Sequence, residues 1–133
     1  MMKKDTIRQH PTAGRTVLVV DDNEMLVEFA ATVLKAAGHS VKQFSDPKAA
    51  LRALDNADPK PDVLVTDYEM GEMNGLELIQ RSLKIHPALK TLLLSGTVDG
   101  SITLSHPVKV DCFLGKPYKP EQLLAAVAGI MKK

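Results

Sequence analysis

With 133 residues, 44% of them apolar and 25% charged, the chain has the length and composition of one folded domain, which excludes a disordered protein. Seventeen Lys and Arg against sixteen Asp and Glu leave a formal charge of +1, so no field of one sign is present to hold nucleic acid or an anionic membrane. One cysteine excludes an internal disulfide, and no apolar run approaches the ~20 residues of a membrane span, so we expect a cytoplasmic protein.

The start of the chain shows no periodic pattern. Residues 1–14 mix charge with Pro11, and we expect a mobile arm here, with the folded domain spanning 15–133. The first apolar run, Thr16–Val20, is continuous, which is typical of a strand covered on both faces. A second, weaker strand is predicted at Ser40–Phe44.

Two helices are predicted around that second strand. The first has an apolar face at helical spacing and stops at Gly38. Asp46 followed by Pro47 is typical of an N-cap and the first position of the next helix, which continues through Leu54. The apolar face of the first helix consists of Leu26, Phe29, Ala30, Val33, Leu34 and Ala37.

The second half of the chain continues the alternation. A fourth helix belongs at 99–107, but glycine, serine and proline there predict a short or frayed element. Five strands alternating with helices imply right-handed crossovers and one parallel sheet with helices on both faces. The other predicted elements are strands at Val63–Thr66, Thr91–Leu94 and Val110–Leu114, and helices at Leu76–Leu83 and from Pro120 onwards.

In such a sheet, ligands bind beyond the carboxyl ends of the strands. Asp21 and Asp22 follow the first strand and Asp67 follows the third. Three carboxylates in one small volume repel unless a cation lies among them, and hard oxygen ligands select magnesium or calcium, with magnesium favoured here. Ser95 and Lys116 follow the fourth and fifth strands and suit a phosphoryl group. Taken alone, Asp21 and Asp22 fit a helix cap or a solvent-facing acid as well as a metal site. Singly, Ser95 is more typical of a turn residue and Lys116 of a surface cation. Together these residues predict a phosphoryl-accepting aspartate.

The sequence resembles response-regulator receiver domains of two-component signalling over residues 15–131. The resemblance implies a doubly wound, flavodoxin-like α/β fold whose five parallel strands follow the order 2-1-3-4-5, as in the chemotaxis member of the family. The matching stretches are Asp21-Asp22, DVLVTDYEMGEMNGLELI at 62–79, LLLSG at 92–96 and FLGKPY at 113–118.

The resemblance also implies a role for each acidic residue. Asp67 would be the phosphoacceptor, supplied by the phosphohistidine of a sensor histidine kinase or of a histidine phosphotransfer protein. Asp22 would bind Mg²⁺ directly and Asp21 mostly through water. Asp67 itself and the backbone carbonyl of Glu69 would complete the protein ligands.

The remaining implied roles belong to the last two strands. The Ser95 hydroxyl and the Lys116 amine would stabilise the phosphoryl group. Ser95 and Phe113 would form the switch, because movement of Ser95 towards the phosphoryl group leaves space that Phe113 can fill. The Lys116–Pro117 peptide bond is expected to be cis.

Three features bear on how this chain uses the site. Gly71 stands where relatives usually carry proline, which loosens the loop after the phosphoacceptor. Glu69 and Thr97 occupy the positions that tune phosphoryl lifetime in the family. Residues 100–107 carry no formal charge with His neutral, whereas transcription-factor receivers dimerise through charged residues there, so we expect a monomer.

We therefore expect a stand-alone response regulator that is not an enzyme, loses its phosphoryl group slowly and acts on an unknown downstream protein. It binds neither nucleic acid nor membrane in this interpretation. Alternatives are a receiver excised from a longer regulator or hybrid kinase, a flavodoxin-like carrier, and an aspartyl-phosphate hydrolase. Met70 and Met73 either present an adaptable partner surface or pack within their loop.

Overall fold

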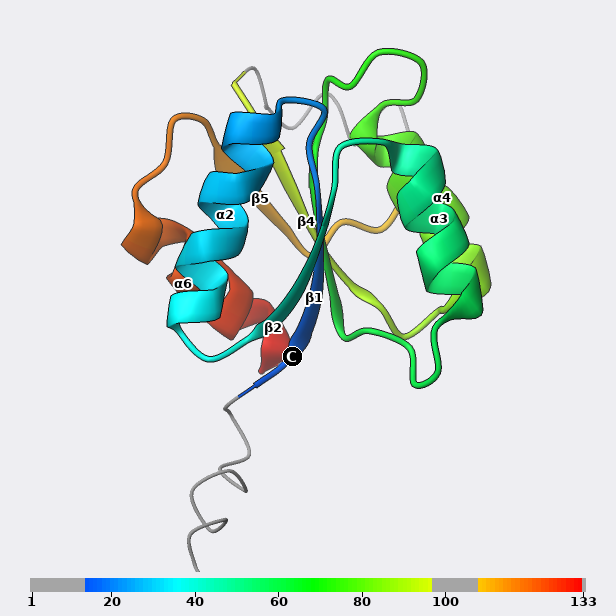
Figure 1. The fold of residues 1–133 in the computed structure, drawn as a ribbon, viewed down its shortest axis with the longest axis horizontal. Helices are drawn as coiled ribbons and strands as arrows, with labels where there is room; N and C mark the ends of the chain where they lie inside the picture. Colours follow the sequence, from blue (N-terminus) through cyan, green and yellow to red (C-terminus); the bar gives the residue numbers. More distant parts are fainter. Residues whose placement is uncertain (1–13, 97–107, 133) are drawn as a thin grey trace, which may run out of the picture.

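The computed structural model describes residues 14–96 and 108–132. The expectations for the arm before Gly14, for a short helix at 99–107 and for Thr97 lie outside these residues. Five parallel strands form one sheet in the order β2-β1-β3-β4-β5, which confirms the predicted topology (Figure 1). The strands are β1 (Thr16–Val20), β2 (Ser40–Phe44), β3 (Val63–Asp67), β4 (Lys90–Ser95) and β5 (Cys112–Gly115).

Helices cover both faces of the sheet, so the fold is doubly wound (Figure 1). One face carries α2 (Glu24–Ala36) and α6 (Pro120–Met131), and the other carries α3 (Pro47–Asn56) and α4 (Gly75–Ile85). Three of these helices begin at an N-cap residue whose side chain accepts a backbone N–H of the first turn. These N-caps are Asn23 for α2, Asp46 for α3 and Asn74 for α4.

The core lies in two layers, one on each side of the sheet. In β1, Val17 and Val19 pack against α2 and α6, whereas Leu18 and Val20 pack against α3 and α4. All four side chains are at most 3% exposed. Alternate residues of a strand point to opposite faces, so a strand buried on both faces needs a continuous apolar run.

Helix α2 differs from its sequence-based prediction in the face that it buries. Leu26 and Phe29 belong to the apolar face predicted from the sequence, but they are 40% and 42% exposed. Because α2 carries apolar residues over more than one stripe, its periodicity fits two orientations, and packing on the sheet selects one. The buried stripe consists of Val27, Ala30, Ala31 and Leu34.

The structure corrects the predicted start of β5 and decides between the two alternatives for Met70 and Met73. Strand β5 begins at Cys112 and not at Val110. Met70 and Met73 are 5% and 4% exposed, so these methionines pack within the loop and into the core and do not form a partner surface. Within the described part of the chain, no helix is both long and apolar enough to cross a membrane.

Candidate functional site

The carboxyl ends of β1, β3 and β5 bring one lysine to two aspartates. Lys116, just after β5, donates from Nζ to Asp67 Oδ1 at 2.8 Å and to Asp21 Oδ2 at 3.2 Å. Asp67 is the last residue of β3 and Asp21 follows β1. Asp22 joins this cluster, since carboxylate oxygens of Asp21, Asp22 and Asp67 all lie within 4.8 Å of one another.

Burial separates the roles of the three carboxylates. Asp21 and Asp67 are 3% and 6% exposed, whereas Asp22 is exposed to solvent. The backbone holds Asp21 in place: its Oδ1 accepts the Asn23 N–H at 3.0 Å, and its own N–H donates to the Phe44 carbonyl at 3.1 Å. The cluster therefore has two buried carboxylates, Asp21 and Asp67, and one carboxylate, Asp22, that solvent reaches.

The charges of these groups shift one another's protonation. Burial and the charge of Asp21 raise the pKa of Asp67, against the opposing effect of its hydrogen bond from Lys116. Burial lowers the pKa of Lys116, but its hydrogen bond to Asp67 and the two carboxylate charges outweigh burial and leave that pKa raised. At neutral pH the lysine is therefore a fixed cation at the edge of an acidic cluster.

The three carboxylates fit a hard divalent cation. Ligand oxygens about 2.1 Å from Mg²⁺ lie within ~4.2 Å of one another, so donors held within 4.8 Å need only a small adjustment. One lysine leaves excess negative charge among three carboxylates, which a divalent ion would neutralise. Asp21, Asp22 and Asp67 are the side chains that would hold it. Glu69, whose carbonyl is the further ligand implied by the resemblance, is exposed in the loop after β3.

Ser95 and Phe113 lie on the neighbouring strands β4 and β5. Ser95 ends β4, is 2% exposed, and is opposite Gly115 in the register of β4 with β5. Its carbonyl accepts the Lys116 N–H at 3.0 Å, which holds the lysine backbone next to the serine. Phe113 is half-buried opposite Leu93 and packs with the core under α3 and α4.

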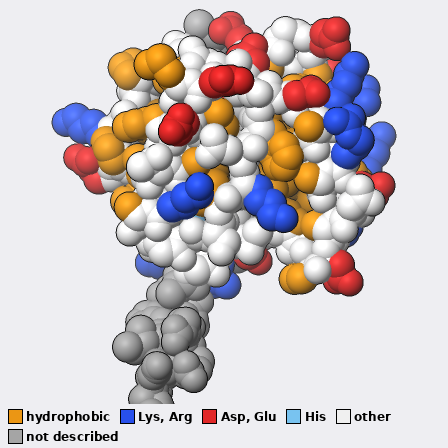
Figure 2. Space-filling model, viewed as in Figure 1, with side chains coloured by type: hydrophobic (Ala, Val, Ile, Leu, Met, Phe, Trp, Pro, Cys, Tyr) orange, Lys and Arg blue, Asp and Glu red, His pale blue; other side chains and the backbone are white. Residues whose placement is uncertain are grey.

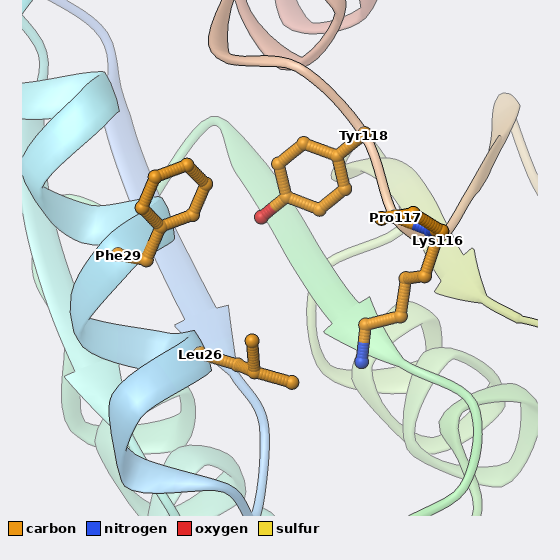
Figure 3. Close-up of a pocket in the computed structure, with 5 residues that line it drawn as sticks. All are labelled: Leu26, Phe29, Lys116, Pro117 and Tyr118. Carbon is orange, nitrogen blue, oxygen red and sulfur yellow. The ribbon is translucent and has the colours of Figure 1, made fainter.

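An apolar groove opens next to Lys116 (Figure 3). Its volume is about 510 Å³, and Leu26 and Phe29 of α2 form one wall. Pro117 and Tyr118 form the other, with the rings of Phe29 and Tyr118 tilted at a centroid distance of 6.0 Å. The Lys116–Pro117 peptide bond is cis.

The sequence does not reveal this groove, because Leu26 and Phe29 recur at the same helical spacing as the residues that α2 buries. The sequence did contain one signal that α2 has apolar residues outside its buried stripe. Met25 is apolar but does not lie on the stripe of Val27, Ala30, Ala31 and Leu34, and it is 80% exposed. Figure 2 shows hydrophobic side chains on the side that carries α2 and α6, with acidic side chains beside them. The exposed acids of this region include Asp22, Glu24 and Glu28.

The chain matches the family model of the response regulator receiver domain over residues 17–128, and it belongs to this family. Its structure is similar to that of the chemotaxis protein CheY4 from Vibrio cholerae, with a TM-score of 0.82 and 26% identity over 89% of this chain and 99% of CheY4. A CheY-like receiver from Methanospirillum hungatei has the same fold, with a TM-score of 0.82 at 21% identity over 90% of this chain and 95% of the other.

Among curated proteins, the transcriptional regulatory protein CreB of Escherichia coli K12 is 30% identical over 122 residues, which are 89% of this chain and 51% of CreB. The sensor kinase CckA of Brucella abortus is 28% identical over 123 residues, covering 92% of this chain and 13% of the kinase. The chain thus spans about half of one relative and a small part of the other. The family match identifies this chain as a response regulator receiver domain of two-component signalling.

Proposed function

We propose that this receiver is a Mg²⁺-dependent phosphoacceptor, in which Asp67 takes a phosphoryl group from the phosphohistidine of a sensor histidine kinase or of a histidine phosphotransfer protein. The observation that carries the proposal is the 2.8 Å hydrogen bond from Lys116 Nζ to Asp67 Oδ1 within a cluster that also contains Asp21 and Asp22. A nucleophilic carboxylate, a fixed cation and a divalent-ion site are the groups that phosphoryl transfer needs.

The reaction moves one phosphoryl group between two residues. An Asp67 carboxylate oxygen attacks phosphorus in line, the O–P bond forms as the N–P bond of phosphohistidine breaks, and the imidazole leaves and is reprotonated from water. The Lys116 amine and the Ser95 hydroxyl donate to the equatorial oxygens, where negative charge accumulates. When bound by Asp21, Asp22, Asp67 and the Glu69 carbonyl, Mg²⁺ supplies further positive charge to those oxygens.

The same contacts provide a switch. Ser95 and Phe113 lie on adjacent strands, so a Ser95 side chain drawn towards the phosphoryl group changes the packing available to Phe113. Couplings of this kind are typically ~1–3 kcal/mol, enough to change which protein binds the surface around β5. Glu69, exposed two residues after Asp67, controls access of water to the acyl phosphate and so the slow rate of its loss.

The test is incubation of the purified chain with acetyl phosphate, with and without Mg²⁺, followed by peptide mass mapping. We expect one phosphoryl group on Asp67 only when Mg²⁺ is present, and none on Asp67→Asn. Asp62→Asn, which changes a carboxylate beside the opposite end of β3, is the matched control and should be modified like wild type. Modification that is independent of Mg²⁺, or that persists in Asp67→Asn, would contradict the proposal.

The groove beside Lys116 is where the phosphodonor protein docks in this proposal. It is apolar, it is lined by Lys116, whose amine is hydrogen-bonded to Asp67, and Leu26 and Phe29 are exposed although apolar. Phe29→Ser should slow transfer about tenfold from an autophosphorylated histidine kinase, because a buried aromatic anchor contributes at least 1–2 kcal/mol to an interface. The same variant should react with acetyl phosphate at the wild-type rate; equal slowing with both donors would contradict docking at the groove.

We further propose that the chain acts as a stand-alone monomer, as a unit of the size of CheY4, almost all of which it matches. A single species of the mass of the 133-residue chain, detected in its own cells, supports this role. A larger species would place the receiver in a longer regulator. Sedimentation with and without beryllofluoride should give a monomer in both states, and a dimer formed with beryllofluoride would contradict the monomer.

A further inference from the structure

The end of the sheet opposite the phosphoacceptor carries a buried pair that joins β4 to β5. The Thr91 N–H donates to Asp111 Oδ2 at 2.8 Å, and the Asp111 N–H lies 3.1 Å from both the carbonyl oxygen and the hydroxyl oxygen of Thr91. The Thr91 hydroxyl is 3.3 Å from the Lys109 carbonyl and 3.4 Å from Asp111 Oδ2. Thr91 is fully buried and the Asp111 side chain is 6% exposed, so water does not compete for these bonds.

Strand β5 depends on such an anchor more than any other strand that carries a site residue. It has four residues and, in the described part of the chain, pairs with β4 alone, whereas β3 pairs with both β1 and β4. The pairing is between Leu92 and Cys112 at one end and between Ser95 and Gly115 at the other. A slip of one residue would turn every side chain of β5 to the opposite face of the sheet.

The register of β5 decides where Lys116 lies. Lys116 is the first residue after the strand, and its amine reaches both Asp21 and Asp67. Its backbone N–H bond to Ser95 closes one end of β5, and the bonds between Thr91 and Asp111 close the other. The four-residue strand is thus held at both ends against β4.

We propose that Asp111 is a positioning residue for phosphoryl transfer: by fixing the start of β5 on Thr91, it places the Lys116 amine at Asp67. The proposal rests on the function proposed above. Asp111 contacts neither the phosphoacceptor nor the metal-binding carboxylates, and its effect passes through the strand to Lys116.

The chain contains a matched control for this device. Asp62 precedes β3 and accepts the Thr16 N–H on Oδ2 at 2.9 Å, and its own N–H donates to the Thr16 carbonyl at 2.9 Å. The bonds are of the same kind and lie at the same end of the sheet. Because β3 is paired on both sides, loss of the Asp62 carboxylate should weaken the fold without moving Lys116.

The experiment compares Asp111→Ala with Asp62→Ala at saturating Mg²⁺ and under conditions in which urea unfolding shows both variants to be folded. We expect Asp111→Ala to react with acetyl phosphate about tenfold more slowly than wild type, as a small misplacement of a catalytic group predicts. Its Mg²⁺ affinity, measured by calorimetry, should be no weaker than that of wild type, since the metal-binding side chains come from β1 and β3. Asp62→Ala should react at the wild-type rate.

Two further variants separate positioning from general destabilisation. In a Lys116→Ala background, Asp111→Ala should cause no additional loss of rate, because the lysine through which it acts is gone. Asp111→Asn keeps an oxygen that can accept the Thr91 N–H and should recover most of the rate, and it serves in place of Asp111→Ala if that variant does not fold. The proposal would be overturned if Asp111→Ala lowered the rate as much in the Lys116→Ala background as it does in wild type. It would also be overturned if folded Asp111→Ala reacted at the wild-type rate.

A structural measurement distinguishes this proposal from the function on which it rests. The backbone amide NMR signals of Ser95 and Lys116 should shift in Asp111→Ala and stay near their wild-type positions in Asp62→Ala. Should wild type accept no phosphoryl group, these shifts still report whether Asp111 places Lys116. Unchanged signals in Asp111→Ala would overturn the positioning role even if wild type is phosphorylated.

Discussion

Lys116 is the residue on which the charge balance of the site depends. Its amine is shared between Asp67 at 2.8 Å and Asp21 at 3.2 Å, so one cation faces two carboxylates that have lost most of their water. The pKa of Asp67 is raised nonetheless, because burial and the charge of Asp21 outweigh the bond from Lys116. A divalent cation among the same carboxylates would favour the ionised form of Asp67, which is the form that the proposed phosphoryl transfer needs.

His39, which is not part of the site, should make the free energy of unfolding depend on pH. The Arg15 N–H donates to His39 Nδ1 at 3.3 Å, and burial, followed by the charge of Arg15, lowers the pKa of His39 below 6.5. The unfolded chain then binds a proton at a higher pH than the folded chain does. The free energy of unfolding should therefore decrease as pH falls below about 6.5, until the folded histidine is itself protonated.

Urea unfolding of wild type and His39→Gln between about pH 5 and 7.5 checks this prediction. The free energy of unfolding of His39→Gln should depend less steeply on pH in the acidic part of the range. Near the upper end of this range the two curves should become nearly parallel, because the histidine is then mostly neutral in both the folded and the unfolded chain. Equal slopes below pH 6.5 would contradict the expected shift.

At the scale of elements, the start of α4 is packed against the end of β3, where Asp67 lies. The Gly75 N–H donates to the Tyr68 carbonyl at 2.8 Å, and the Asn74 side chain accepts the Glu77 N–H at 2.9 Å. A Cβ at position 75 would overlap the Asp67 carbonyl oxygen and lie 2.7 Å from Leu93 Cδ1. The helix can approach β3 this closely only because residue 75 has no side chain.

Gly75→Ala should therefore lower the free energy of unfolding by about 1–3 kcal/mol, the usual effect of overpacking. Gly129→Ala is the matched control, since Gly129 also lies in a helix and a Cβ there would meet nothing within 4 Å. Alanine at position 129 should raise the free energy of unfolding by about 0.5–1 kcal/mol through helix propensity. Urea denaturation measures both, and a Gly75→Ala chain as stable as wild type would show that α4 can move away from β3.

At the scale of the whole molecule, the fold gathers charge at one edge of the sheet. Parallel strands end at the same edge, so Asp21, Asp67 and Lys116 meet there although 95 and 49 residues separate the lysine from the two aspartates. Folding therefore brings the negative charge of Asp67 next to that of Asp21, whereas the unfolded chain keeps these two charges apart. Any cation that binds this edge and not the unfolded chain stabilises the fold.

Mg²⁺ should accordingly stabilise the protein, by about 1.4 kcal/mol at a concentration ten times its dissociation constant. Thermal or urea unfolding with increasing Mg²⁺ measures the effect. Asp22→Asn should abolish most of it, because Asp22 offers a ligand oxygen and is exposed, so its loss costs little folding energy. Asp55→Asn changes another exposed carboxylate, on α3, and should keep the full response; equal responses in both variants would contradict the assigned site.

Much of the fold could be predicted because its signals are local. The apolar run Thr16–Val20 and the N-cap Asp46 act within one or two turns of chain, and the predicted strands β1 to β4 lie within a residue of those observed. The start of β5 was predicted two residues too early, because its position depends on the bonds between Asp111 and Thr91, which are 20 residues apart. Sequence spacing carries no information about such a pair.

The amino-acid sequence by itself determined the alternation of strands and helices and the strand ends at which Asp67 and Lys116 stand, because periodicity and capping depend on near neighbours. Tertiary structure alone decided that one amine serves two carboxylates, that Met70 is buried, and that Phe29 lines a groove and not the core. Each of these outcomes depends on which surfaces of separate elements exclude water from one another, and that is set by the packing of the whole sheet and its helices.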